Sequence, residues 1–178
     1  MAYDPPHTIS SGELVGLDTM NGEWGGNIAF LANPPACRVY NSSAESIADH
    51  TLVTVTFNSE RYDTDTMHST SVNTGRITVK TAGLYVVSFS GEMAAANDYT
   101  YVGALLILNG VTYIASHFTR SDGGVDPPRF TVTTTYKFAV NDYVEVHIWQ
   151  DNAANAARNL NASGNYSPEF SATWIGLG

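Results

Sequence analysis

The sequence predicts an all-β protein, and its composition, its alternating apolar residues and its turn signals all favour that class. Of its 178 residues 43% are hydrophobic and only 14% charged, and much of the polar remainder is Thr, Ser, Asn and Gly. β-Branched and turn-forming residues favour strands over helices. In the stretch 76–89, apolar residues alternate with polar ones before a Gly-containing turn, and Tyr85, Val87 and Phe89 share one face of the strand after it. Such alternation is typical of strands.

Beyond residue 36 we expect short strands separated by turns, as in a sandwich or jelly roll. Turn signals include Asn109-Gly110 and Asn141-Asp142, which bend the chain for steric reasons. No long helix fits this region, and no fixed-period repeat is present. The expected strands are 38–41, 52–57, 76–80, 84–92, 101–108, 112–118, 130–138, 143–149 and 169–175.

Residues 1–35 differ from the rest and are expected to form a separate, partly helical arm that ends at Pro34-Pro35. Apolar residues from Leu14 to Leu31 recur at helical steps of three and four, and Asp18 is positioned to cap the helix. Three glycines argue against a stable isolated helix. We therefore expect the arm to order on a partner. The alternative is that it covers the open end of its own domain.

Several strands carry apolar residues on both faces, which predicts a subunit interface. In the strand 101–108, one face carries Val102 and Leu106 and the other Tyr101 and Leu105. A simple two-sheet sandwich has polar outer faces, and wet apolar surface invites aggregation. The alternative is that loops or the arm cover this surface. The residues expected in an interface or core are Tyr85, Phe89, Tyr101, Leu105, Tyr143 and Trp149.

The charge and the N-terminal sequence exclude several classes of partner and compartment. Eight Lys and Arg stand against seventeen Asp and Glu, a formal charge of −9, which repels nucleic acid. A single cysteine, Cys37, excludes an intrachain disulfide and a cysteine metal cage. The chain shows neither a signal peptide nor a membrane span. We expect a protein made in the cytoplasm, not secreted by a signal peptide, with no membrane partner.

The sequence lacks the motifs of common active sites, and we expect neither an enzyme nor a cofactor. A Gly-x-Ser-x-Gly elbow is absent, and the five histidines show no zinc-ligand spacing, so each is expected at a surface or edge. Calcium is the alternative, held by Glu60, Asp63 and Asp65 or by Asp122 and Asp126, since carboxylates in loops can ligate it. The simpler interpretation is that these are solvated turn carboxylates.

A few loop residues are candidates for recognition of a host glycan or protein, because loops on a rigid sandwich often carry binding sites. Aromatic rings provide stacking surfaces, and amides provide hydrogen bonds of the kind that sugars use. The candidates are Tyr99, Asp122, Asn152 and Asn155. The alternative is that the Asn-rich stretches only form turns.

Three segments of the β-rich region resemble the complement C1q/tumour-necrosis-factor-like domain. The residues similar to the signature of that family are Phe57 and Asp63, followed by Ile77 and the run Gly83-Leu-Tyr-Val-Val-Ser-Phe89. Residues 139–148 and 170–175 resemble the late strands of that family. The chain departs from the pattern at Ile77 and Val87, where Phe is usual. The resemblance implies a ten-stranded jelly-roll sandwich over residues 36–178 that forms a homotrimer around a threefold axis.

The arm has a second resemblance, to short bacteriophage virion proteins with a C1q-like head. The matching segments are Met1-Ala2, Pro5-Pro6, Gly12-Glu-Leu14 and Asn27-Ile-Ala-Phe-Leu31. This implies a non-enzymatic trimer in the virion, attached to phage capsid or tail proteins by its arm. The expected anchoring residues are Leu14, Leu17, Trp24, Ile28, Phe30 and Leu31.

We expect a capsid decoration (head) protein, because the sequence has no shaft between arm and head. The first alternative is a tail-fibre or minor tail adhesin that binds a host surface glycan or protein. The second is a soluble C1q/TNF-like ligand or lectin.

Overall fold

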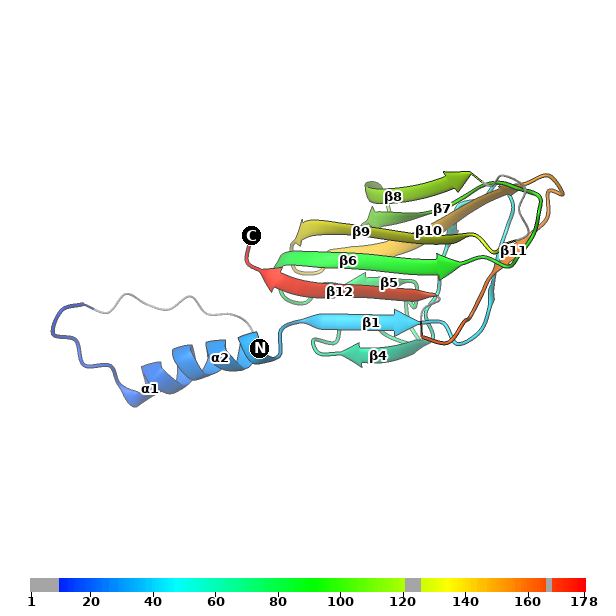
Figure 1. Ribbon diagram of the computed structural model, residues 1–178. Coiled ribbons are helices and arrows are strands. Elements are labelled where there is room, and N and C mark those ends of the chain that lie inside the picture. The colour runs from blue at the N-terminus through cyan, green and yellow to red at the C-terminus, as the bar shows by residue number, and fades with distance from the viewer. Residues whose placement is uncertain (1–9, 121–125, 166–167) are drawn as a thin grey trace.

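The protein is an antiparallel β sandwich with a helix projecting from one end, at which the C-terminus also lies (Figure 1). The structure is a computed structural model and describes residues 10–120, 126–165 and 168–178. The predictions of an all-β fold and of a short helical N-terminal segment are both confirmed.

In the described part of the chain, ten strands form the two main sheets, five in each, as the jelly-roll resemblance predicts. The first sheet has the order β4-β1-β12-β6-β9. Its strands are β1 (Ala36–Tyr40), β4 (Ser59–Asp63), β6 (Gly83–Glu92), β9 (Arg129–Phe138) and β12 (Glu169–Gly176). The second has the order β3-β10-β7-β8, and β5 also pairs with β10. Its strands are β3 (Val53–Thr54), β5 (Arg76–Thr78), β7 (Tyr99–Leu108), β8 (Thr112–Arg120) and β10 (Tyr143–Asn152).

Three strands lie where the sequence pattern predicts none. They are the edge strand β4 and a small two-stranded sheet made by β2 (Glu45–Ile47) and β11 (Arg158–Leu160). The β4 segment has Glu60, Arg61 and Asp63 among its five residues, so it carries no apolar alternation. Its strand character comes from pairing with β1 at the sheet edge. The expected strand 52–57 is also too long, since β3 comprises only Val53–Thr54.

The turn between β5 and β6 carries the chain from one sheet to the other. β5 pairs with β10, whereas β6 lies between β12 and β9. Gly83, at the end of this turn, has a φ of +150°. A Cβ there would collide with the Trp174 ring and the Gly176 carbonyl oxygen. Only glycine fits such a close approach.

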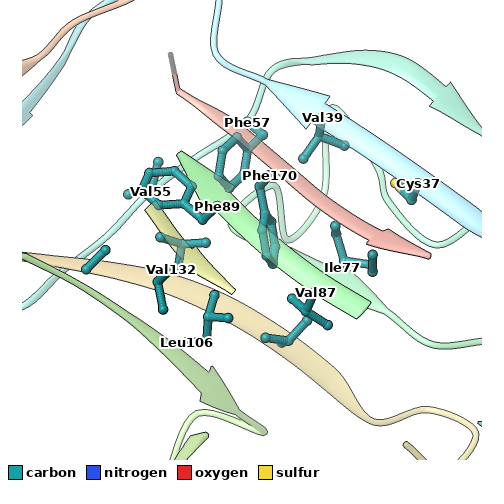
Figure 2. Packing of buried hydrophobic residues seen from close by; sticks show 14 of the residues in the cluster. Cys37, Val39, Val55, Phe57, Ile77, Val87, Phe89, Leu106, Val132 and Phe170 are labelled. Atoms are coloured by element: carbon teal, nitrogen blue, oxygen red, sulfur yellow. The ribbon is translucent and has the colours of Figure 1, made fainter. Parts of the chain in front are cut away.

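Aromatic side chains from three separate segments fill the space between the sheets (Figure 2). Phe57, between β3 and β4, stacks on Phe170 of β12 at 5.4 Å between ring centroids and meets Phe89 of β6 edge-on at 6.5 Å. All three rings are fully buried. Along β6 the inward face also carries Tyr85, whose hydroxyl donates to the Thr81 carbonyl oxygen at 2.6 Å. Burial raises the pKa of that phenol.

The arm forms a continuous run of helix made of α1 (Leu17–Thr19), the π-helical η1 (Met20–Gly25) and α2 (Gly26–Ala32). The prediction that Asp18 caps this helix is wrong. Gly16 is the N-cap and makes no side-chain cap, while Asp18 lies in the first turn. A carboxylate there still interacts favourably with the helix dipole. Across the described ranges, every helix is too short or too polar to span a bilayer.

The aromatic packing predicts a large effect of Phe57 on stability. Replacing a buried Phe by Ala removes apolar contacts and leaves a cavity, so Phe57→Ala should lower the free energy of unfolding by about 3–5 kcal/mol. Denaturant unfolding at one fixed protein concentration measures this. Val111→Ala, at a residue 77% exposed, is the control and should change stability by less than about 0.5 kcal/mol. Equal effects of the two variants would contradict the proposed role of the ring.

Candidate interaction surfaces

The projecting helix carries a row of exposed apolar side chains, which we call the helix stripe: Leu17, Met20, Trp24, Ile28 and Leu31. Their exposed fractions run from 41% for Trp24 to 75% for Leu17. They follow one another at steps of three and four residues, so they share one side of the helix. Leu14, also predicted as an anchor, is 95% exposed and precedes the helix. A row of this kind is unusual on a monomer surface.

Phe30 is the exception among the predicted anchoring residues, because it packs into its own domain. Its side chain is 2% exposed and meets the Trp174 ring edge-on at 4.9 Å between centroids. It therefore cannot contact another protein without leaving the core, and its assignment as a free anchor is wrong. Neither pattern nor spacing distinguishes Phe30 from its neighbours, because Trp174 lies 144 residues further along the chain.

Hydrogen bonds also fix the segment between the helix and β1. Thr64 donates its hydroxyl to the Pro34 carbonyl oxygen at 2.8 Å, and the Ala36 amide donates to the Thr64 hydroxyl oxygen at 2.8 Å. The Trp174 amide donates to the Pro35 carbonyl oxygen at 2.9 Å. With the fixed φ of the two prolines, these bonds set the direction in which the helix leaves the head.

A second apolar surface lies on the outer face of the β3-β10-β7-β8 sheet. Five side chains line a shallow depression, which we call the outer-sheet hollow: Leu52, Leu105, Tyr113, Phe118 and Trp149. Tyr113 and Phe118 on β8 are 63% and 48% exposed. Gly103 on the neighbouring β7 leaves room for the Phe118 ring, which a Cβ there would clash with. The hollow thus presents aromatic rings on a rigid sheet.

The six residues predicted for an interface or core lie either in the buried core or on the second sheet. Tyr85 and Phe89 are fully buried in the core. Tyr101 is 42% exposed, while Leu105 and Trp149 are half-buried, all on the second sheet. The sixth, Tyr143, is half-buried and lies under an arginine, with the Arg76 guanidinium carbon 4.5 Å from its ring centroid.

Two of the predicted recognition residues are buried, and their assignment to exposed loops is wrong. Tyr99 and Asn152 are partners across β7 and β10, at 3% and 1% exposure. The Tyr99 hydroxyl donates to the Ala94 carbonyl oxygen, and burial raises the pKa of Tyr99 to about 12. Asn155 is exposed, with a positive φ of 50° that fits a turn. The fourth candidate, Asp122, lies outside the described residues.

The acidic segment 60–65 is part of β4 and the turn after it, and its carboxylates are used within the chain. Asp63 accepts hydrogen bonds from the amides of Asp65 and His68. Glu60 pairs with the His68 ring at 2.9 Å. His68 is buried, so the expectation that every histidine lies at a surface or edge is wrong for this one. Asp65 accepts from the Thr81 hydroxyl at 2.9 Å.

The structure brings together one group of potential cation ligands that sequence spacing did not reveal. In the described part of the chain, Asp49, His50 and Asp151 each place one ligand atom within 4.8 Å of the others. His50 Nδ1 contacts an Asp49 carboxylate oxygen, and its Nε2 lies 3.3 Å from Asp151 Oδ1. The hydrogen bond to Asp49 raises the pKa of His50 above its ordinary value. About 100 residues separate the two halves of this group.

Other acidic side chains hold strands together at points where they are buried. Glu169 on β12 is 5% exposed and pairs with Arg38 at 3.0 Å and with Arg61 at 2.8 Å, which links β12, β1 and β4. Glu92 on β6 pairs with Arg129 of β9 at 2.6 Å. Burial works to raise the pKa of Glu92, but hydrogen bonds from neighbouring side chains outweigh it and lower that pKa. These carboxylates are structural.

The chain is similar to solved structures of C1q/TNF-like domains. Murine APRIL at pH 5.0 has 9% identity and a TM-score of 0.60, covering 79% of this chain and 98% of its own. Murine APRIL at pH 8.5 gives a TM-score of 0.58 with the same identity and coverage. The globular domain of zebrafish complement 1qA protein gives 14% identity and a TM-score of 0.53, covering 81% and 99%. At this identity the likeness shows the fold, and it confirms the predicted C1q/TNF-like jelly roll. Neither a known family model nor a curated protein sequence matches the chain.

The contacts of His50 predict an imidazole that holds its proton above the ordinary pKa of about 6.5. NMR titration of its ring protons should show this, and Asp49→Asn should lower the pKa. Because the pKa is raised on folding, the linked stabilisation is present below about pH 6.5 and is lost as the pH rises through the folded-state pKa. Asp151→Asn is the control and should have the smaller effect. A His50 pKa at or below the ordinary value would contradict the assignment.

Proposed function

We propose that the protein is a non-enzymatic structural protein of a phage particle, a homotrimer displayed on the capsid as a decoration protein and attached by its N-terminal arm. One observation carries the proposal. A C1q/TNF-like head has at one end a helix whose apolar residues are exposed and whose direction is fixed (Figure 1). Such a molecule has a display domain at one end and, at the other, a helix whose exposed apolar side chains can bind a partner.

Self-association is supported by the fold and by the apolar surface that the monomer leaves exposed. The C1q/TNF resemblance implies compact trimers. The head carries exposed apolar residues on the second sheet and at the end near the arm, where Ile175 and Leu177 are each 51% exposed. Closed cyclic symmetry covers such surfaces without open-ended association.

Decoration, rather than a long fibre, is supported by the short connection between arm and head. Asn33, Pro34 and Pro35 alone separate α2 from β1, and hydrogen bonds hold this segment against the head. A head joined so closely to its attachment lies near the particle surface. The resemblance of the arm to short bacteriophage virion proteins supports a phage as the particle.

The non-enzymatic part of the proposal is supported by how the chain uses its acids and bases. Glu169, Glu92 and Asp98 form ion pairs with arginines that join separate strands or loops. Buried His68 is held by Glu60 and the Thr74 carbonyl oxygen. Groups engaged in this way stabilise the fold and are not presented to a substrate.

The proposal predicts that purified protein binds to particles that lack it and that the arm is required. The full chain should sediment as a trimer of about 58 kDa, three times the 19.2 kDa chain. It should rebind to the particles, whereas a variant lacking residues 1–33 should not. Co-sedimentation with particles measures the binding.

Val111→Ser, at an exposed residue of the head far from the arm in sequence, is the matched control and should bind normally. Circular dichroism must show that the truncated chain keeps its β structure. Binding by a folded truncated chain equal to that of the full chain would overturn the attachment role of the arm.

A tail-fibre adhesin that recognises a host glycan is a second candidate, favoured by the outer-sheet hollow. Its rings Tyr113, Phe118 and Trp149 form a platform of the kind on which sugar rings stack. The Trp149 ring also meets the His50 imidazole edge-on at 5.9 Å. That contact places hydrogen-bonding groups beside the aromatic surface.

The adhesin candidate predicts that glycan binding depends on Trp149. If a glycan array identifies a ligand, Trp149→Ala should weaken its binding at least about tenfold, since truncating an aromatic anchor of a binding site commonly costs more than about 1.4 kcal/mol. Tyr62→Ala, on the other sheet at 45% exposure, is the control and should bind normally. An array without binding, or equal loss in both variants, would remove this candidate.

A further inference from the structure

We propose that the helix stripe is the contact between copies of this chain, so that three arms pack as a parallel three-helix bundle beneath three heads. This inference rests on the trimer of the proposed function. It reassigns Leu17, Trp24, Ile28 and Leu31 from particle anchoring to assembly. Leu14, which precedes the helix and is 95% exposed, remains available for contact with the particle.

The spacing of the stripe resembles that of helices that pack against one another along their length. From Leu17 through Met20, Trp24 and Ile28 to Leu31 the steps are three, four, four and three residues, so two steps of four follow one another where a heptad repeat alternates three and four. The apolar residues still form a narrow row that can face partner helices. The π-helical turns Met20–Gly25 take more residues per turn than an α-helix. The step from Met20 to Trp24 falls there, whereas the step from Trp24 to Ile28 ends in α2.

The attachment of the helix to the head determines the orientation that three arms would share. Phe30 is seated against Trp174, and the hydrogen bonds of Pro34 and Pro35 hold the connection. Phe30 lies off the stripe, so the contact with the head and the stripe use different sides of the helix. In a trimer with threefold symmetry, three helices fixed in this way point in the same sense along the axis. Each stripe residue then lies at the same height as its two copies.

The arm helix is marginal on its own, and two other arms offer apolar surface against which it can pack. Its sixteen residues, 17–32, include Gly22, Gly25 and Gly26, and its N-cap makes no side-chain bond. An isolated helix of this length and composition is marginal in water. From their exposed fractions, the five stripe side chains offer roughly 500 Å² of surface per chain, or about 1,500 Å² in three copies. This is roughly 500 Å² for each of the three pairwise contacts, below the ~1,000 Å² of a stable interface, so the bundle adds to the contact between the heads and does not replace it.

The charges of the helix are compatible with close packing of like copies. Its acidic residues are Asp18 and Glu23, it has no Lys or Arg, and neither acid belongs to the stripe. Identical negative charges placed at a bundle core would be costly. Outside the stripe they remain in water, where salt screens them.

Cysteine cross-linking of the full-length protein tests the parallel bundle. Leu17→Cys and Ile28→Cys should form disulfide-linked dimers under mild oxidation, because each new thiol lies beside its own copy. Asp18→Cys and Ala29→Cys are exposed neighbours off the stripe and serve as matched controls. We expect cross-linking at least ten times faster at the two stripe positions. The natural Cys37 is fully buried, so the unmodified chain provides the blank.

Sedimentation of the same variants separates failure of this inference from failure of the proposed function. A trimer that cross-links no faster at Leu17 and Ile28 than at the controls would overturn the bundle and leave the trimer standing. A monomer at micromolar concentration would overturn both. If cross-linking at the stripe is absent in the free trimer and the stripe variants instead fail to join particles, the stripe contacts the particle and the bundle is refuted. As a second readout, Ile28→Asp should weaken the trimer while the head keeps its circular dichroism spectrum.

Discussion

The packing of Phe57 between Phe89 and Phe170 is the contact on which the rest of the molecule depends. Phe57 lies on the segment that leaves one sheet and enters the other, while its partners come from β6 and β12 in the middle of the first sheet. Closing the sandwich on these rings commits one face of every central strand to the core. Whatever apolar surface the opposite faces carry must then be covered by something else.

That constraint explains where exposed apolar residues gather. On β7, Val102 and Leu106 point into the core, so Tyr101 and Leu105 necessarily face outward. On β10, Ile148 is buried, and Trp149 therefore turns to the outer-sheet hollow. The outer face of the first sheet has a different character, since β9 presents Thr there. The two outer faces thus differ in chemistry, and burial against a partner would stabilise the apolar face of the second sheet more than the polar face of the first.

The architecture could be predicted from the sequence because alternation and turn chemistry are local. The alternation along β6 placed Tyr85 and Phe89 on one face, and the structure has them there. The strand β4 could not be predicted in this way, because its residues carry no apolar alternation and pair only at an edge. The candidate sites were harder still. Tyr99 and Asn152 look like loop residues in the sequence, but pairing between β7 and β10 buries both. The group of Asp49, His50 and Asp151 depends on a contact between distant segments.

The same distinction applies to the arm, where one residue decides how the others can be used. Six apolar residues suggested a single anchoring surface, and only the contact with Trp174 separates Phe30 from the rest. Because Phe30 is committed to the head, the helix cannot turn to bury its stripe against its own domain. Leu17 and Ile28 therefore stay exposed in the monomer at 75% and 68%. Water is a poor environment for such a row. A rigid joint that holds apolar residues away from the head makes intermolecular contact the remaining way to bury them, and symmetry among identical chains supplies that contact without a second protein.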